Sequence, residues 1–326
     1  MITPYFDSLF DDFGIWQHAD GEKPLPEHGY ALDDATRGLL ICLALGRSQQ
    51  SNTLFNYILQ SRKGDEFYGF YNAERKPIQF PASEDAKGQV AWAMGYASSL
   101  NFKKIQAQHI IGSLRQSLLS LQSVRGLAYA LLGAIYYDRT LALALQRSLA
   151  GRFHNLKDAW FWPENVMTYA NGIIPYALLR YALVFGDKPS EQLGRKILTF
   201  IEKQCVHERL RGPIGYEGWY KQGDPKAADD GQQAIDVTYM IFAWMCAWQL
   251  SHNKNDLRYP TLWMLWFEGE NIANRKMYEQ KTLKAFDGIH LNNPNHHKQG
   301  VNYHSGAESN ICFLLARYLI TAQSTL

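Results

Sequence analysis

One kind of segment returns six times along this chain of 326 residues. Each copy starts with a polar or acidic stretch and continues as an almost unbroken apolar run rich in alanine, leucine and aromatic residues. Helices that are apolar all round belong in a protein interior, and strand signals are scarce between them. The sequence therefore predicts an all-α protein. The six predicted buried helices span residues 34–45, 84–98, 124–137, 170–185, 232–250 and 307–320.

Helices with a single apolar face alternate with the buried ones. Six helices of each kind, with a spacing of roughly 40 to 70 residues between buried helices, form a helical-hairpin repeat. The closed form of such a repeat is an (α/α)6 toroid, so we expect residues 1–326 to form one toroid domain. The amphipathic helices are predicted over residues 53–61, 102–121, 141–153, 190–204 and 257–267, and residues 4–13, or the segment just after them, would supply a sixth.

The starts of the buried helices combine carboxylates with aromatic and amide side chains. In a toroid these helices run parallel, so their starts gather at one mouth. The helix dipole favours Asp and Glu in any first turn, so a single carboxylate there is more often a cap than a catalyst. Rings and amides at the same ends are typical of a sugar site, because a sugar has both an apolar face and hydroxyls. The segments are HGYALDDATRG (28–38), ASEDAKGQVAW (82–92), WPENVMTYANG (162–172), PIGYEGWY (213–220), DDGQQAID (229–236) and VNYHSGAES (301–309).

Carboxylates at these starts are the candidate catalytic groups. Glycoside cleavage needs two carboxyl groups, one protonated and one ionised. Asp236 ranks first, because a carboxylate early in an otherwise apolar helix needs a partner or a purpose. Its predicted partner is Asp33 or Asp34, and both lie within one helical turn of Arg37, at ion-pair spacing. The other candidates are Glu308, Glu84 and Glu217.

Aromatic and polar residues beside these carboxylates are the candidate substrate-binding groups. Aromatic residues make up 13% of the chain, and many of them fall inside the predicted buried helices, where they serve packing. Those at the helix starts could instead flank sugar rings. The candidate substrate-binding residues are His28, Tyr30, Arg37, Asp85, Trp92, Tyr169, Asn171, Trp219, Tyr220, Gln232, Gln233, Asp287, Asn302 and His304.

Histidines support a second interpretation. His290, His296, His297 and His304 lie in a polar C-terminal loop, and His28 precedes the first buried helix. A loop of solvated imidazoles explains them without function, since no HExxH or similar metal spacing is present. A functional pair would be His28 and His304, because both lie at the mouth. A histidine with a near-neutral pKa suits proton abstraction beside a carbonyl, which indicates an epimerase or isomerase.

Charge and motif content exclude several classes of protein. The 33 basic and 31 acidic residues leave a net charge of +2, too small to create a field for nucleic acid or an anionic membrane. The apolar runs are shorter than a membrane-spanning helix, and the N-terminus lacks the features of a signal peptide. The four cysteines are scattered, without a CxxC pair. We expect a soluble, cytoplasmic protein without metal, cofactor, nucleic acid or membrane partners; the sequence does not determine its oligomeric state.

Eight segments, taken in order, resemble a family of six-hairpin (α/α)6 domains. Such domains occur alone or joined to family-4 glycosyltransferases, and near mannoside phosphorylases. The resemblance spans residues 28–320 and implies the toroid and a carbohydrate context. LDDA stands where the family usually has TDDN, and YHSGAESN where it commonly has NQGAEST, which implies a different ligand preference. The segments are HGYALDDATRGLL, SEDAKGQVAWAMG, TYANGIIPYALL, PIGYEGWY, DGQQAIDV, LWFEGEN, FDGIH and VNYHSGAESN.

Residues and resemblance together predict a carbohydrate-active enzyme. The leading hypothesis is a glycoside hydrolase that acts on an oligosaccharide or small glycoside, mannosides included, by carboxylate acid/base catalysis. One alternative is a sugar epimerase or isomerase that depends on the histidines. The other is a non-catalytic glycan-binding domain associated with glycosyltransferases.

Overall fold

The chain folds into two compact units of α-helical hairpins. The computed structural model describes residues 3–207, 210–292, 300–323 and 326. Unit 1 consists of residues 1–149, 306–311 and 326, and unit 2 of residues 150–305 and 312–325. Because residues 306–311 belong to unit 1, the start of the last helix completes the N-terminal half of the chain.

The predicted helices are present, with bounds that differ by a few residues. The six buried and five amphipathic helices are confirmed, and the helix predicted near the N-terminus is a short one. The described helices are α1 Pro4–Ser8, α2 Leu32–Ala44, α3 Ser48–Ser61, α4 Glu84–Ser99, α5 Lys104–Leu119, α6 Val124–Ile135, α7 Arg139–Gly151, α8 Ile173–Phe185, α9 Lys188–Gln204, α10 Ala234–Ser251, α11 Lys254–Glu268 and α12 Ala307–Ala322, with two 3-10 helices, η1 Pro26–His28 and η2 Asp158–Trp160.

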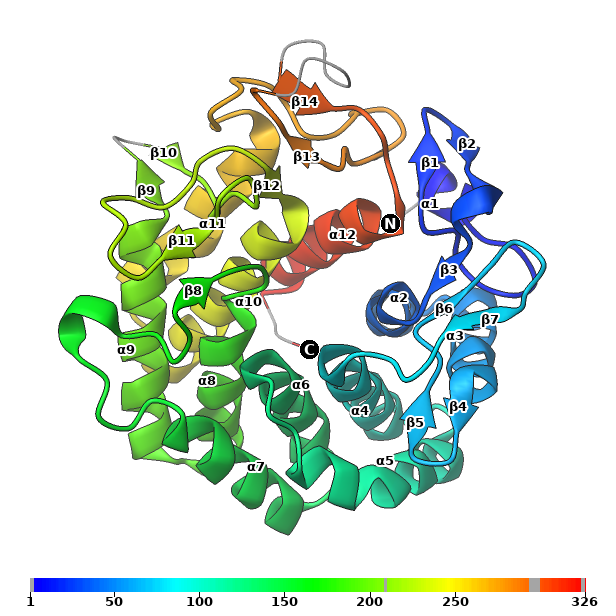
Figure 1. The fold of residues 1–326 in the computed structure, drawn as a ribbon, viewed down its shortest axis with the longest axis horizontal. Helices are drawn as coiled ribbons and strands as arrows, with labels where there is room; N and C mark the ends of the chain where they lie inside the picture. Colours follow the sequence, from blue (N-terminus) through cyan, green and yellow to red (C-terminus); the bar gives the residue numbers. More distant parts are fainter. Residues whose placement is uncertain (1–2, 208–209, 293–299, 324–325) are drawn as a thin grey trace. The chain divides into compact units, whose positions relative to one another are not determined.

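In unit 1, α4 lies between α2 and α6 (Figure 1). In addition, α2 packs on α3, and α4 packs on α5. The contact between α4 and α6 depends on glycines two helical turns apart, Gly88 and Gly95 facing Gly126 and Gly133. A Cβ atom at Gly133 would overlap the carbonyl oxygen of Ala91. These glycines therefore let the two helix backbones approach more closely than any larger side chain would allow.

In unit 2, α8 packs on α9 and α10, and α10 packs on α11. Glu202 on α9 accepts hydrogen bonds from the indole nitrogens of Trp244 at 3.0 Å and Trp263 at 2.9 Å. Its other oxygen lies 2.6 Å from Nε of Arg211. A buried carboxylate is stable only with such partners, so this network ties α9, α10 and α11 together.

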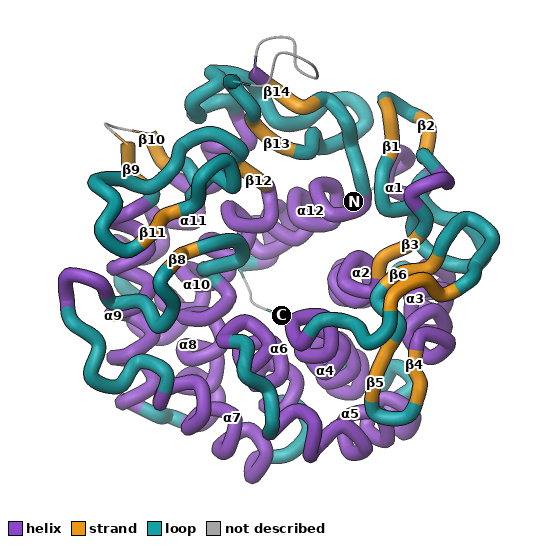
Figure 2. The backbone as a smooth tube through the Cα atoms, in the orientation of Figure 1, coloured by secondary structure: helices purple, strands orange, loops and turns teal. Residues whose placement is uncertain are grey.

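Short strands occupy the loops between the helices (Figure 2). The sheets are small and antiparallel, and two of their strands lead directly into buried helices: β3 into α2, and β12 into α10. The strands thus fix the direction in which these two helices begin. The strands are β1 Ala19–Asp20, β2 Lys23–Pro24, β3 Tyr30–Ala31, β4 Arg62–Lys63, β5 Glu66–Phe67, β6 Phe70–Tyr71, β7 Pro77–Gln79, β8 Val166–Met167, β9 Val206–His207, β10 Leu210–Arg211, β11 Tyr220–Lys221, β12 Gln232–Gln233, β13 Gly288–Ile289 and β14 Val301–Asn302.

Two further findings concern the environment of the chain. Within the described ranges, no helix combines the length and the apolar character that crossing a membrane requires. The four cysteines are free thiols inside the protein: Cys42, Cys205, Cys246 and Cys312.

Candidate active site

In unit 1, three carboxylates surround one arginine. The first turn of α2 supplies Asp33 and Asp34, its second turn supplies Arg37, and the first turn of α12 supplies Glu308. Nη2 of Arg37 lies 3.0 Å from Asp33 Oδ2 and 3.1 Å from Asp34 Oδ1. The same nitrogen lies 2.9 Å from Glu308 Oε2. We call these four residues the Arg37 cluster. It unites three of the predicted catalytic carboxylates.

Burial divides the Arg37 cluster into an inner and an outer pair. The side chains of Arg37 and Asp34 are only 2% and 4% exposed, whereas those of Asp33 and Glu308 are each 37% exposed. Burial raises the pKa of Asp34 well above its usual range, the negative charges of Asp33 and Glu308 raise it further, and Arg37 opposes the shift. Asp34 therefore tends to keep its proton, while Asp33 and Glu308 meet solvent.

The same carboxylates could also act as metal ligands. One oxygen from each of Asp33, Asp34 and Glu308 lies within 4.8 Å of the others, and carboxylate oxygens are typical ligands of hard cations. Arg37 already contacts an oxygen of every one of them. A metal ion would have to compete with this guanidinium, so proton transfer or hydroxyl binding fits the set better.

Hydrogen bonds hold the two helix starts of the cluster in place. The Thr36 hydroxyl donates to Oε1 of Gln89 at 3.0 Å inside the core, which links α2 to α4. At the start of α12, the backbone nitrogen of Ala307 donates to the carbonyl of Gln17 at 3.0 Å. The Asn310 amide donates to the Gly306 carbonyl at 2.7 Å. Functional groups on anchored helices keep their geometry better than groups on loops.

The predicted binding residues ahead of α2 serve packing or lie at the surface. Tyr30 is buried, stacks on Trp16 with ring centroids 4.2 Å apart, and donates to Oδ2 of Asp11 at 2.6 Å. Burial and the Asp11 carboxylate raise its pKa. His28 is exposed at the end of η1, with its ring 4.8 Å from that of His18.

The predicted site residues on α4 are used for capping and packing. Glu84 accepts hydrogen bonds from the backbone nitrogens of Gln122 at 2.8 Å and Ser123 at 2.5 Å, and Asp85 accepts one from the Ser123 hydroxyl. Both carboxylates thus hold the start of α6. Trp92 is 1% exposed and stacks on Tyr129 inside the core. A ring buried to this degree is not available for stacking on a sugar.

In unit 2, one small sheet collects several predicted binding residues. Strands β12, β13 and β14 pair in that order, with Gln233 opposite Gly288, which in turn lies opposite Asn302. The Asp287 backbone nitrogen donates to the carbonyls of Asn302 and His304. Gln232, Gln233, Asp287, Asn302 and His304 therefore lie on one sheet and its flanks, at the start of α10.

Asp236 and Gln232 are buried, whereas the other predicted binding residues on this sheet and its flanks are half-buried. Asp236 is 5% exposed in the first turn of α10. Burial raises the pKa of Cys205, and the negative charges of Glu202 and then Asp236 raise it further. Gln232 is fully buried, and its Oε1 accepts a hydrogen bond from Nε1 of Trp266 at 2.7 Å. Gln232 thus links strand β12 to helix α11.

The aromatic candidates of unit 2 lie on two paired loops. Strand β11 pairs with β8, with Tyr220 opposite Met167, which brings the YEGWY loop beside the loop that carries Tyr169. Glu217 is exposed, Trp219 is half-buried, and Tyr169 is 38% exposed. The Tyr220 ring packs against Trp160 at 5.1 Å. Asn171 is buried, and its amide donates to the Thr168 carbonyl at 2.6 Å.

Two functional groups in unit 2 were not predicted from the sequence as a pair. The hydroxyl of Tyr216 lies 2.7 Å from Nε2 of His290, and the two rings are 4.9 Å apart. Nearby, buried Asp230 accepts hydrogen bonds from the backbone nitrogens of Gly231, Leu291 and Asn292. No local spacing signals such contacts. His296 and His297 lie outside the described residues.

No protein-family model and no curated protein sequence matches the chain. Solved structures do match. A sugar epimerase from a ruminal bacterium matches with a TM-score of 0.73 and 10% identity, over 99% of this chain and 96% of that one. A D-mannose isomerase matches with a TM-score of 0.71 and 10% identity, over 98% and 95%. The GH76 α-mannanase of Bacteroides thetaiotaomicron matches with a TM-score of 0.57 and 9% identity, over 98% and 94%.

These likenesses identify the fold class. The chain has the (α/α)6 toroid fold, as the helical repeat predicts. The similar structures are carbohydrate-processing enzymes of more than one reaction type. Association with glycosyltransferases, which the sequence resemblance implies, stays a prediction.

Proposed function

We propose that this protein is a carbohydrate-active enzyme that hydrolyses a glycosidic bond by carboxylate acid/base catalysis at the Arg37 cluster. The observation that carries the proposal is that one guanidinium holds three carboxylates, of which Asp33 and Glu308 are accessible and Asp34 is buried. Glycoside cleavage uses one protonated and one ionised carboxyl group, and crowded carboxylates keep protons to higher pH.

The residues of the Arg37 cluster take different roles in this proposal. Asp33 and Glu308 meet the substrate and exchange protons with it, because they are the members that reach solvent. Arg37 holds the carboxylates together and limits their mutual repulsion. Asp34 is a positioning residue, because it contacts Arg37 from the buried side of the cluster. Asp236, buried in the first turn of α10 in unit 2, stays a predicted catalytic carboxylate.

Sugar epimerisation or isomerisation is the second candidate reaction. The structures with the higher TM-scores are a sugar epimerase and a D-mannose isomerase. His304, beside Asp287 and Asn302, would be the proton-transfer group in unit 2. Since the fold supports both reactions, the chemistry of the product must separate them.

Proton NMR in D2O separates the candidates in one assay. The substrates are mannose-, glucose- and galactose-containing disaccharides and the free reducing sugars. Hydrolysis removes the signal of the glycosidic anomeric proton and leaves carbon-bound protons in place. Epimerisation at a carbon beside the carbonyl converts a reducing sugar and introduces deuterium there. Glycan binding without any product would support a non-catalytic domain.

A further inference from the structure

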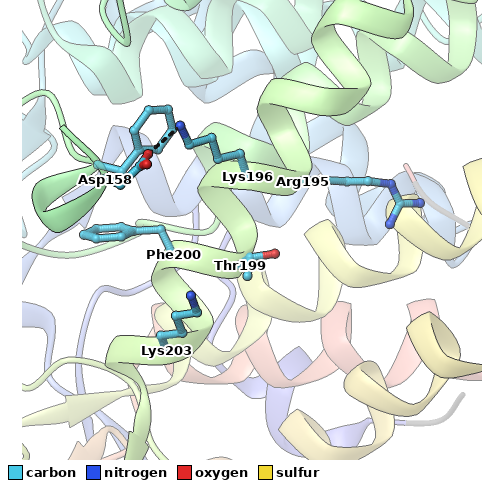
Figure 3. A pocket seen from close by; sticks show the side chains of 7 residues that line it. Asp158, Arg195, Lys196, Thr199, Phe200 and Lys203 are labelled. Carbon is cyan, nitrogen blue, oxygen red and sulfur yellow. Dashed lines mark ion pairs between the residues drawn. The ribbon is translucent and has the colours of Figure 1, made fainter. Parts of the chain in front are cut away.

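The outer face of α9 carries a cavity that is separate from the residues assigned above. The cavity has a volume of about 510 Å³ and lies between α9 and the segment around η2 (Figure 3). Small-molecule sites commonly occupy 300 to 1,000 Å³, so the cavity is large enough for a monosaccharide-sized ligand. Its α9 residues Lys196, Thr199, Phe200 and Lys203 have the spacing of one helix face.

Lys196 and Lys203 both line this cavity from positions two helical turns apart on α9, and Phe200 lies on the turn between them (Figure 3). Nζ of Lys196 lies 3.9 Å from the centroid of the Phe161 ring, a cation–π contact that fixes its position. Lys203 forms no hydrogen bond or ion pair with any part of the chain that the structure describes. One lysine is therefore pre-positioned, and the other is available to a ligand.

The remaining charges at the cavity are accounted for. Arg195 points away from it, donating to Asp256 at 2.9 Å and to the Ala247 carbonyl at 2.8 Å (Figure 3). Asp158 pairs with Lys196 at 2.8 Å, but its side chain is 88% exposed. An ion pair this exposed contributes little stability, so a ligand anion with more negative charge can displace Asp158 from Lys196.

We propose that this cavity binds a small sugar phosphate, with the phosphate between Lys196 and Lys203 and the sugar against Phe200. A phosphate monoester has three strong acceptor oxygens and close to two negative charges, which matches the two ammonium groups of Lys196 and Lys203. The volume of about 510 Å³ suits a small molecule better than an acidic peptide. The sugar part of this inference rests on the proposed function, whereas the phosphate part rests on the cavity alone.

Calorimetric titration of the full chain with mannose 6-phosphate, mannose and inorganic phosphate tests the inference. Mannose 6-phosphate should bind, with an affinity that falls as salt rises, and mannose should not bind at this site. Lys203→Gln should weaken binding by about tenfold, through loss of a charge-assisted hydrogen bond. Asp158→Asn should strengthen it several-fold, because the competing carboxylate is removed. Lys188→Gln, on the same helix but outside the cavity, should change nothing.

Three outcomes would overturn the inference. Absence of binding would reject the site, and so would equal affinity in the Lys203→Gln and Lys188→Gln variants, which would place the ligand elsewhere. Inorganic phosphate binding as tightly as mannose 6-phosphate would reject the sugar part. Because the readout is binding, it does not depend on turnover, and failure of the proposed hydrolase reaction would leave the phosphate result intact.

Discussion

Arg37 and Glu308 lie near opposite ends of the sequence, yet Nη2 of Arg37 lies 2.9 Å from Oε2 of Glu308. This contact adds a third carboxylate to the pair that Arg37 already forms with Asp33 and Asp34 on α2. One buried cation thus joins the start of the first buried helix to the start of the last. The chemistry that we propose depends on this convergence.

Replacing Arg37 should destabilise the fold in a pH-dependent way. Arg37→Met leaves three carboxylates crowded around a position without positive charge, and removal of one partner of a buried ion pair typically costs about 3–5 kcal/mol. The loss should shrink at acidic pH, because the carboxylates then take up protons. Urea unfolding of the wild type and of Arg37→Met at pH 7 and at pH 4.5 measures the loss in free energy of unfolding at each pH. Equal losses at the two pH values would contradict the electrostatic account.

Asp34→Asn should change how stability depends on pH. Because burial raises the folded-state pKa of Asp34, its contribution to stability is complete below the unfolded pKa of about 3.9 and is lost as pH rises through the folded-state value. Asparagine does not titrate. Between the unfolded-state and folded-state pKa values of Asp34, the free energy of unfolding of the variant should therefore rise relative to that of the wild type by up to about 1.4 kcal/mol per pH unit. Urea unfolding from pH 4 to pH 8 follows this difference. The exposed Asp65→Asn control should show no such trend, and a flat difference for Asp34→Asn would refute the prediction.

The contact between α4 and α6 predicts a contrast between two glycines. Gly133→Ala places a methyl group against the Ala91 carbonyl and should reduce the free energy of unfolding by about 1–3 kcal/mol or more. Gly151→Ala, in α7, has open space around it and should stabilise the protein by about 0.4–1 kcal/mol. Thermal and urea unfolding of both variants measure the contrast. Similar effects at the two positions would show that the helices do not approach this closely.

Glu202 should act as a structural anchor without a catalytic role. Glu202→Ala leaves the indole N–H groups of Trp244 and Trp263 without their acceptor, and each unsatisfied buried donor costs about 1–3 kcal/mol. Glu202→Gln keeps one carbonyl acceptor and should lose less. Urea unfolding monitored by tryptophan fluorescence reports both the stability and the environment of these rings. If both variants were as stable as the wild type, the hydrogen bonds from Trp244 and Trp263 to Glu202 would contribute nothing to the free energy of unfolding.

The helical framework could be predicted because it depends on a local signal. Apolar runs and helical spacing are visible within a dozen residues, so α4, predicted over 84–98, runs from Glu84 to Ser99. The pairing of Arg37 with Asp33 and Asp34 is equally local, at i,i+4 and i,i+3. The strands, two or three residues long, are too short for such a signal.

Long-range contacts decide the rest, and the sequence does not contain them in readable form. Glu84 and Glu308 have similar local patterns at helix starts, but Glu84 caps the start of α6, whereas Glu308 joins the Arg37 cluster. The pairing of Tyr216 with His290 depends on loop geometry that no spacing indicates. Sequence patterns predict both carboxylates as candidate site residues. Only tertiary contacts distinguish a residue that caps a helix from a candidate catalytic residue.

The most direct test of the central claim is the D2O NMR assay carried out on wild type, Asp33→Asn, Glu308→Gln and the Asp65→Asn control with the same disaccharide panel. The account predicts hydrolysis by the wild type and the control, without deuterium at carbon. It predicts rates at least 100-fold lower for the two cluster variants, since positioned acid/base groups contribute about 10²–10⁴ in rate. Undiminished turnover in Asp33→Asn and Glu308→Gln, or deuterium incorporated into an epimerised sugar in place of hydrolysis, would contradict it.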